Sequence, residues 1–145
     1  MRRVTVRRSP VHGRGVFALR ALEAGERILE YKGEVIMWRT AVRQYLRHND
    51  PGRTYLFGLS NGRVIDGGRG GNSARWLNHA CEANCEAIEI GNRVFIHVTT
   101  SVPAGTELFL DYQLAVDGSA NDESRQQYRC LCGSRRCRGT MLGGA

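Results

Sequence analysis

The sequence predicts a mostly β fold of short strands joined by turns, with one inserted helix and a small Cys-rich appendix near its end. The length of 145 residues and a hydrophobic fraction of 41% suit one domain with a buried core. The 18 glycines indicate many turns and close backbone approaches, not long helices. Short runs of β-branched and aromatic residues recur between turn residues, as is typical of strands.

The predicted strands share this composition and lie at residues 5–8, 16–19, 27–31, 53–59, 87–90, 93–99 and 107–112. A Gly-rich turn separates the first two strands. Gly91 and Asn92 form a two-residue hairpin signal, because glycine adopts the positive φ that such a loop requires. The turn at residues 103–105 precedes the last strand.

One amphipathic helix is expected over residues 38–48. Its apolar side chains recur at helical spacing and are Trp38, Ala41, Val42, Tyr45 and Leu46. Asn-Asp-Pro-Gly at residues 49–52 would end it. Residues 73–77 predict a further short helical turn.

The end of the chain changes in composition. A polar stretch at residues 117–124 reads as a linker, so the predicted division is a main domain at 1–116, a linker at 117–127 and a Cys-rich segment at 128–145. Cys130, Cys132 and Cys137 have the close spacing of metal ligands, with disulfide or free cysteines as the alternative. Structural zinc takes four ligands, and Cys81 or Cys85 would supply the fourth.

The net charge of +7 comes almost entirely from arginine, because Lys32 is the only lysine. A basic surface could attract nucleic acid or acidic proteins. No arginine run exceeds two residues, which favours charge spread over the surface. No apolar run approaches the roughly 18 residues of a membrane span, and no apolar segment follows the basic N-terminus. We therefore expect no membrane association and a reducing compartment, in the cytoplasm, nucleus or nucleoid.

Gly13, Arg14 and Gly15 begin a G-x-G-x-x-A pattern, which alone resembles a dinucleotide-binding fingerprint. The context argues against that interpretation. Residues 16–19 read as a strand, and the turn at residues 24–25 comes too soon for a crossover helix. The pattern alone is therefore compatible with either a tight hairpin or a loop that cradles a ligand.

Residues 75–85 concentrate polar chemistry. Asn78, His79, Cys81 and Asn84 lie close enough along the chain to suit recognition of a ligand. A capped turn or a pair of metal ligands are the alternatives. Asp111 and Tyr112 follow an apolar run, which reads alone as a core strand with a polar end.

In order, these motifs resemble a SET domain followed by a post-SET zinc segment. The resemblance spans residues 6–141, and its elements are H-G-R-G-V-F-A, E-Y-x-G-E, Y-L-F-x-L, G-N-S-A-R-W-L-N-H-A-C-x-A-N-C, G-T-E-L-F-L-D-Y and C-x-C-G-x3-C-R-G. It implies a β-clip arrangement of small sheets with a C-terminal pseudoknot. It also implies transfer of methyl groups from S-adenosylmethionine to a lysine of a histone, nucleoid protein or other basic protein. The rival is a catalytically silent SET-fold module that binds peptide or nucleic acid.

The resemblance also implies site residues. Cofactor contacts would fall on Gly13, Arg14, Gly15, Tyr31, Arg75, Trp76, Asn78 and His79. Tyr112 would be catalytic together with Tyr55, and the lysine channel would be lined by Tyr55, Leu110, Tyr112 and Leu131. Zinc would be held by Cys81, Cys130, Cys132 and Cys137, with Cys85 spare.

The sequence departs from the family pattern at a few positions. Ala80 and Ala83 replace the usual Ser and Pro. Leu110 stands where relatives usually carry Phe or Tyr, and its lack of a hydroxyl favours di- or trimethylation. A basic substrate would need a local acidic groove, for which Glu82 and its neighbours Glu86 and Glu89 are candidates. A bacterial source would make delivery to a host cell conceivable.

Overall fold

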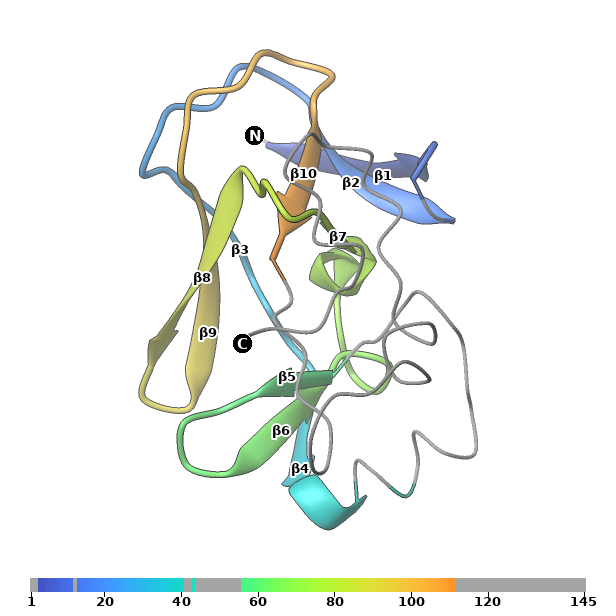
Figure 1. The fold of residues 1–145 in the computed structure, drawn as a ribbon, viewed down its shortest axis with the longest axis vertical. Helices are drawn as coiled ribbons and strands as arrows, with labels where there is room; N and C mark the ends of the chain where they lie inside the picture. Colours follow the sequence, from blue (N-terminus) through green and yellow to red (C-terminus); the bar gives the residue numbers. More distant parts are fainter. Residues whose placement is uncertain (1–2, 12, 41–42, 44–55, 112–145) are drawn as a thin grey trace.

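The computed structural model describes residues 3–11, 13–40, 43 and 56–111 (Figure 1). These residues form small β-sheets around one core, together with one short 3-10 helix, η1 (Ser73–Trp76). The strands are β1 (Val4–Arg8), β2 (Arg14–Ala18), β3 (Arg27–Glu30), β4 (Glu34–Met37), β5 (Leu56–Gly58), β6 (Arg63–Asp66), β7 (Asn78–His79), β8 (Cys85–Ile90), β9 (Arg93–Val98) and β10 (Glu107–Leu110). The predicted mostly β fold class is confirmed.

One sheet has the strand order β1-β2-β10-β7 and brings distant parts of the chain together (Figure 1). β10 runs antiparallel to β2 and parallel to β7, with Phe109 opposite Asn78 and Leu110 opposite His79. A parallel pair needs a long connection, which the β8–β9 hairpin supplies here. The Asn-His pair and the end of β10 therefore lie side by side.

The other two sheets have the strand orders β3-β9-β8 and β4-β6-β5. In the first, β8 and β9 pair from Cys85 with Val98 to Ile90 with Arg93. Gly91 has a φ of 64°, so the predicted two-residue hairpin is confirmed. The second sheet lies at the opposite end of the molecule from β1 and β2 (Figure 1).

The core follows the two-residue period of the strands. On β9, Val94, Ile96 and Val98 are fully buried among the apolar residues of β2 and β10. Phe95 points to the other face, where the guanidinium groups of Arg27 and Arg93 lie 4.1 and 4.9 Å from its ring centre. The alternation explains why the sequence pattern located this hairpin.

The predicted strands correspond to observed strands with shifts of one to a few residues at their ends. β4, β6 and β7 were not predicted from the sequence, because these strands are short and are defined by pairing with distant partners. The helix expected at 38–48 is seen at residues 38–40 and 43, and its remaining residues lie outside the described ones. The short turn at 73–77 is confirmed as η1.

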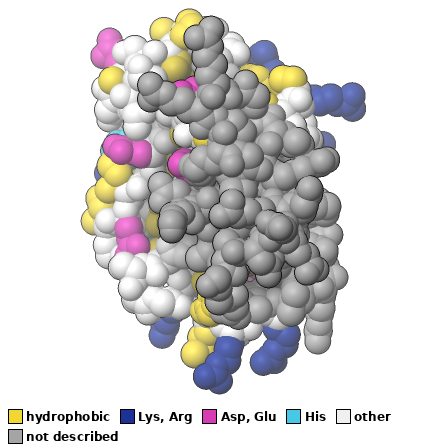
Figure 2. Space-filling model, viewed as in Figure 1, with side chains coloured by type: hydrophobic (Ala, Val, Ile, Leu, Met, Phe, Trp, Pro, Cys, Tyr) yellow, Lys and Arg dark blue, Asp and Glu magenta, His cyan; other side chains and the backbone are white. Residues whose placement is uncertain are grey.

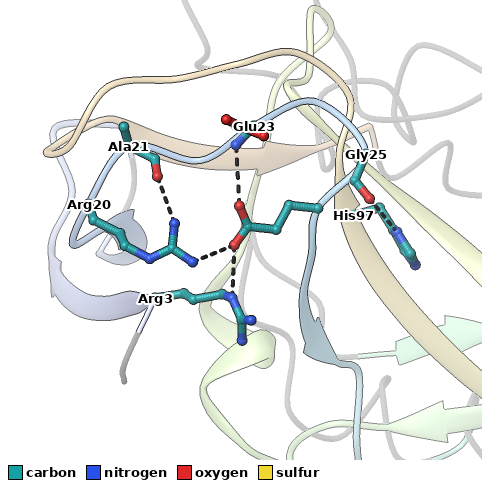
Figure 3. A network of polar contacts seen from close by, with 7 residues as sticks. Arg3, Arg20, Ala21, Glu23, Gly25 and His97 are labelled. Carbon is teal, nitrogen blue, oxygen red and sulfur yellow. Dashed lines mark hydrogen bonds and ion pairs between the residues drawn. The ribbon is translucent and has the colours of Figure 1, made fainter.

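A surface network fastens the start of β1 to the loop between β2 and β3 (Figure 3). Glu26 Oε2 accepts from Arg3 Nε at 2.8 Å and from Arg20 Nη2 at 2.7 Å. Partial burial by itself would raise the pKa of Glu26. Hydrogen bonds from the Glu23 N–H and the two arginines outweigh it and lower that pKa.

Charge is distributed unevenly on the face drawn in Figure 2. Lys and Arg side chains lie in separate places along the rim, without a continuous basic stripe among the residues that this view describes. This agrees with the expectation that the arginines are spread over the surface.

Candidate cofactor-binding site

The short helix η1 leads directly into β7 and is fixed at its start by Asn72. The Asn72 side chain accepts a hydrogen bond from the Ala74 N–H at 3.2 Å and so caps the helix. Its amide also donates to the Glu30 carbonyl at 2.9 Å. This second bond holds η1 against the end of β3, next to Tyr31.

Arg14 joins the Gly-rich start to η1 and β7. Its carbonyl accepts a hydrogen bond from Asn78 Nδ2 at 3.0 Å. Its guanidinium lies 5.6 Å from the centre of the Trp76 ring, and that of Arg75 lies 4.8 Å from the same centre. The predicted cofactor residues from two separate segments are therefore brought together around Arg14, with cations stacked on an aromatic ring.

Glu107 contacts Asn78 from the start of β10, and the sequence did not predict a role for it. Glu107 is 9% exposed, and its carboxylate accepts from Ser9 Oγ at 2.8 Å and from Asn78 Nδ2 at 3.0 Å. A Cβ added at Gly15 would overlap this carboxylate and lie 3.1 Å from the Ser9 Cβ. The one signal in the sequence is an acidic residue at the start of an otherwise apolar strand.

His79 is buried and lies between Cys81 and Asp111. Its Nε2 is 3.5 Å from Cys81 Sγ, and its Nδ1 is 3.7 Å from Asp111 Oδ1. Leu110 is also buried, and its carbonyl accepts from the Ala80 N–H at 3.1 Å. The end of β10 is thus held against the residues that follow β7.

Asn84 belongs to the polar stretch that the sequence predicts for ligand recognition, but the sequence assigned it no specific role. Its Nδ2 donates to the Glu107 carbonyl at 2.9 Å, and its Oδ1 accepts from the Phe109 N–H at 2.8 Å. The side chain thus satisfies the backbone of β10 as a neighbouring strand would. The signal was available in the Asn-His-x-Cys-x-x-Asn element, which ends with this residue.

Tyr31 is 6% exposed and belongs to the core, with its ring centre 5.4 Å from that of Phe57 on β5. It is connected to η1 through the neighbouring Glu30 carbonyl. The structure thus places this predicted cofactor residue between the η1 region and β5, the strand that follows Tyr55 in the sequence.

The remaining predicted site residues lie outside the described ones: Tyr55, Tyr112, Leu131, Cys130, Cys132 and Cys137. Cys81 is partly exposed, whereas Cys85 is buried on β8. Burial raises the pKa of the Cys85 thiol to about 12. Within the described part of the chain, no three His, Cys, Asp or Glu side chains are grouped to hold a metal ion.

No helix among the described residues is both long and apolar enough to span a membrane.

Small sheets that place a Gly-rich strand, an Asn-His strand and a strand ending in Asp111 together have the architecture of a SET domain. The chain belongs to the SET domain family, whose model matches residues 13–113.

Its relatives include "Histone-lysine N-methyltransferase, H3 lysine-4 specific" of Mycosarcoma maydis, 36% identical over 137 residues, and the protein of the same name from Candida albicans, 36% identical over 145 residues. "Histone-lysine N-methyltransferase 2B" of Homo sapiens is 34% identical over 140 residues. These matches cover 90%, 95% and 93% of the chain. The chain spans only 9%, 14% and 5% of the three relatives.

Proposed function

We propose that this protein transfers methyl groups from S-adenosylmethionine to a lysine side chain of a histone or another basic protein. The observation that carries the proposal is the meeting of Arg14, Trp76 and Asn78 at the β7–β10 pair. The strand β10 leads from this point through Asp111 to Tyr112. The three relatives are named histone-lysine N-methyltransferases, and their matches cover 90%, 95% and 93% of the chain.

The residues present fit the cofactor. Gly13 has a φ of 46°, so the backbone can turn sharply where a ligand would approach it. The Trp76 ring offers a flat apolar surface, and Asn78 offers hydrogen-bonding groups for the amino-acid part. His79 would hold the adenine part beside them. When bound, the cofactor supplies a methyl group carried on a positively charged sulfur.

The lysine would enter through a channel lined by Tyr55, Leu110, Tyr112 and Leu131. A free lysine has a pKa of about 10.4, so less than about 0.1% of it is neutral at pH 7. An apolar channel lowers that pKa by desolvation. The aromatic walls would guide the amine and align its lone pair, with Tyr112 orienting it and not acting as a strong base. Leu110 carries no hydroxyl that could crowd the channel with water, which favours di- or trimethylation.

A zinc ion held by Cys81, Cys130, Cys132 and Cys137 would fasten the Cys-rich segment to the cofactor loop. The thiolate is the form that binds metal. The partly exposed Cys81 fits this role, whereas Cys85 is buried in the core on β8. We accordingly divide the chain into a SET domain at 1–116, a linker at 117–127 and a post-SET segment at 128–145.

The substrate class is proposed from charge. The overall charge of +7 repels a basic tail, so local acidic groups must attract it. On β8, Glu86 and Glu89 are exposed, and Ser60 holds Glu89 in place by hydrogen bonds of 2.9 and 2.5 Å. Because three positions separate Glu86 and Glu89, their side chains point to opposite faces of β8, so a docking groove would use one of them together with Glu82.

Methyl transfer from labelled S-adenosylmethionine to core histones and basic nucleoid proteins tests the proposal, with Tyr112→Phe as the control. We expect label on a lysine of at least one protein, seen by mass spectrometry as di- or trimethylation. The control should lose at least about 100-fold in rate, as expected for an orienting group. A chain that neither labels any protein nor binds the cofactor would favour the silent peptide- or nucleic-acid-binding module.

A further inference from the structure

Glu107 and Asp66 are the buried acidic residues of the described chain, each 9% exposed. Asp66 caps its own turn by accepting from the Gly68 N–H at 2.9 Å. The Glu107 carboxylate instead joins segments that are far apart in the sequence, because Ser9 and Asn78 both donate to it. Burying a carboxylate costs free energy even when neutral groups donate hydrogen bonds to it. The presence of Glu107 at this position therefore needs a physical reason.

The reason lies in the orientation of the Asn78 amide. Its Nδ2 donates to Glu107 Oε2 and to the Arg14 carbonyl, each at 3.0 Å. Turning the amide by 180° would place Oδ1 against both of these acceptors, with no hydrogen between them. Nδ2 therefore faces Glu107 and Arg14, and Oδ1 is directed away from these two acceptors.

The Glu107 carboxylate is itself held firmly. Ser9 Oγ donates to it and accepts in turn from the Val11 N–H at 3.0 Å. Gly15 leaves the carboxylate room, since a Cβ there would overlap it. A chain of hydrogen bonds thus runs from the Gly-rich start through Glu107 to Asn78, and such chains reinforce the orientation of their members.

We propose that Glu107 is a positioning residue for the cofactor. By fixing the amide of Asn78, it presents an acceptor oxygen, and not the NH2 group, to the ammonium of the cofactor's amino-acid part. This inference rests on the proposed function, in which Asn78 contacts that part. An ammonium only donates hydrogen bonds, so a turned amide would face it with hydrogens and oppose binding.

The experiment compares two ligands by calorimetry on the whole chain. S-adenosylhomocysteine has the ammonium, whereas 5′-methylthioadenosine shares the adenosine thioether and lacks the amino-acid part. We expect Glu107→Ala to weaken the binding of S-adenosylhomocysteine about ten-fold, which is the effect of losing one hydrogen bond to a charged group. Binding of 5′-methylthioadenosine should change less than about two-fold, because it does not meet the Asn78 oxygen.

Asp66→Ala is the matched control. It removes an equally buried carboxylate away from Asn78, so it should alter the two affinities by the same factor. Glu107→Gln keeps an oxygen for Asn78 and an N–H for Ser9, and should bind S-adenosylhomocysteine within about three-fold of the parent chain. If Glu107→Ala does not fold, Glu107→Asp keeps the charge, withdraws the acceptor by one methylene and should give the same ligand-selective loss.

If the Glu107 variants lowered the affinities for both ligands equally, the inference would be overturned, since this would reveal a general structural effect. Unchanged affinity for S-adenosylhomocysteine would also overturn it. Both results leave the proposed function standing, because the parent chain still binds the cofactor product. A parent chain that binds neither ligand would overturn the proposed function and this inference together.

Discussion

At the scale of single residues, Gly15 and Glu107 pack against each other although 92 positions separate them in the sequence. The sequence pattern alone attributes Gly15 to either a tight hairpin or a loop that cradles a ligand. The structure adds a second reason, because a side chain at this position would occupy the space of the Glu107 carboxylate. Gly15 is thus required by the packing of the interior, in addition to its proposed role in cofactor binding.

This pairing predicts how Gly15→Ala behaves. The added methyl should destabilise the fold by about 1–3 kcal/mol, as overpacking of a close-packed interior does. In Gly15→Ala/Glu107→Ala the overlap disappears, so the loss in free energy of unfolding should be smaller than the sum of the single losses by about 1 kcal/mol. Urea unfolding of the four chains measures this coupling. Strictly additive losses would mean that the two residues do not share this space.

At the scale of elements, the backbone of β10 is hydrogen-bonded by a side chain as well as by its neighbouring strands. The Asn84 amide both donates to and accepts from the backbone of β10, at Glu107 and Phe109. The Asn84 carbonyl also accepts from the Thr99 N–H at 2.9 Å, where β9 ends. This residue therefore fastens the β8–β9 hairpin to the strand that leads to Asp111.

Asn84→Ala should lower the free energy of unfolding by about 1–3 kcal/mol, because two backbone groups of β10 lose their partner. Chemical denaturation gives this value. The exposed Asn61, which bonds Asn92 and the Arg63 N–H, provides a comparison. Asn61→Ala should cost no more than about 0.5 kcal/mol. Equal losses in the two variants would argue against a special role for Asn84.

At the scale of the whole molecule, the proposed zinc site would join two ends of the functional region. Cys81 follows β7 directly, and its sulfur lies beside His79. A metal shared between this residue and the Cys-rich segment would couple the order of that segment to the cofactor loop.

Native mass spectrometry of the purified chain should therefore detect one zinc ion, and removing it with a chelator should lower methyl transfer at least about ten-fold. Cys81→Ala should lose the metal. Cys85→Ala should retain it, because the Cys85 side chain is buried in the core on β8, whereas Cys81 is partly exposed. Zinc that persists in Cys81→Ala, or activity that survives verified zinc loss, would contradict the proposed site.

The sequence by itself determined the features that depend on neighbours in the chain. These are the strand alternation of β9, the Gly91 turn and the short helix η1, and the residues of the proposed cofactor site around Asn78 were likewise named from the sequence. Only the tertiary structure decided what depends on residues far apart: the parallel pairing of β7 with β10, the strands β4 and β6, and the burial of Glu107. The physical reason is that a short strand or a buried carboxylate is stabilised by partners that local periodicity does not identify.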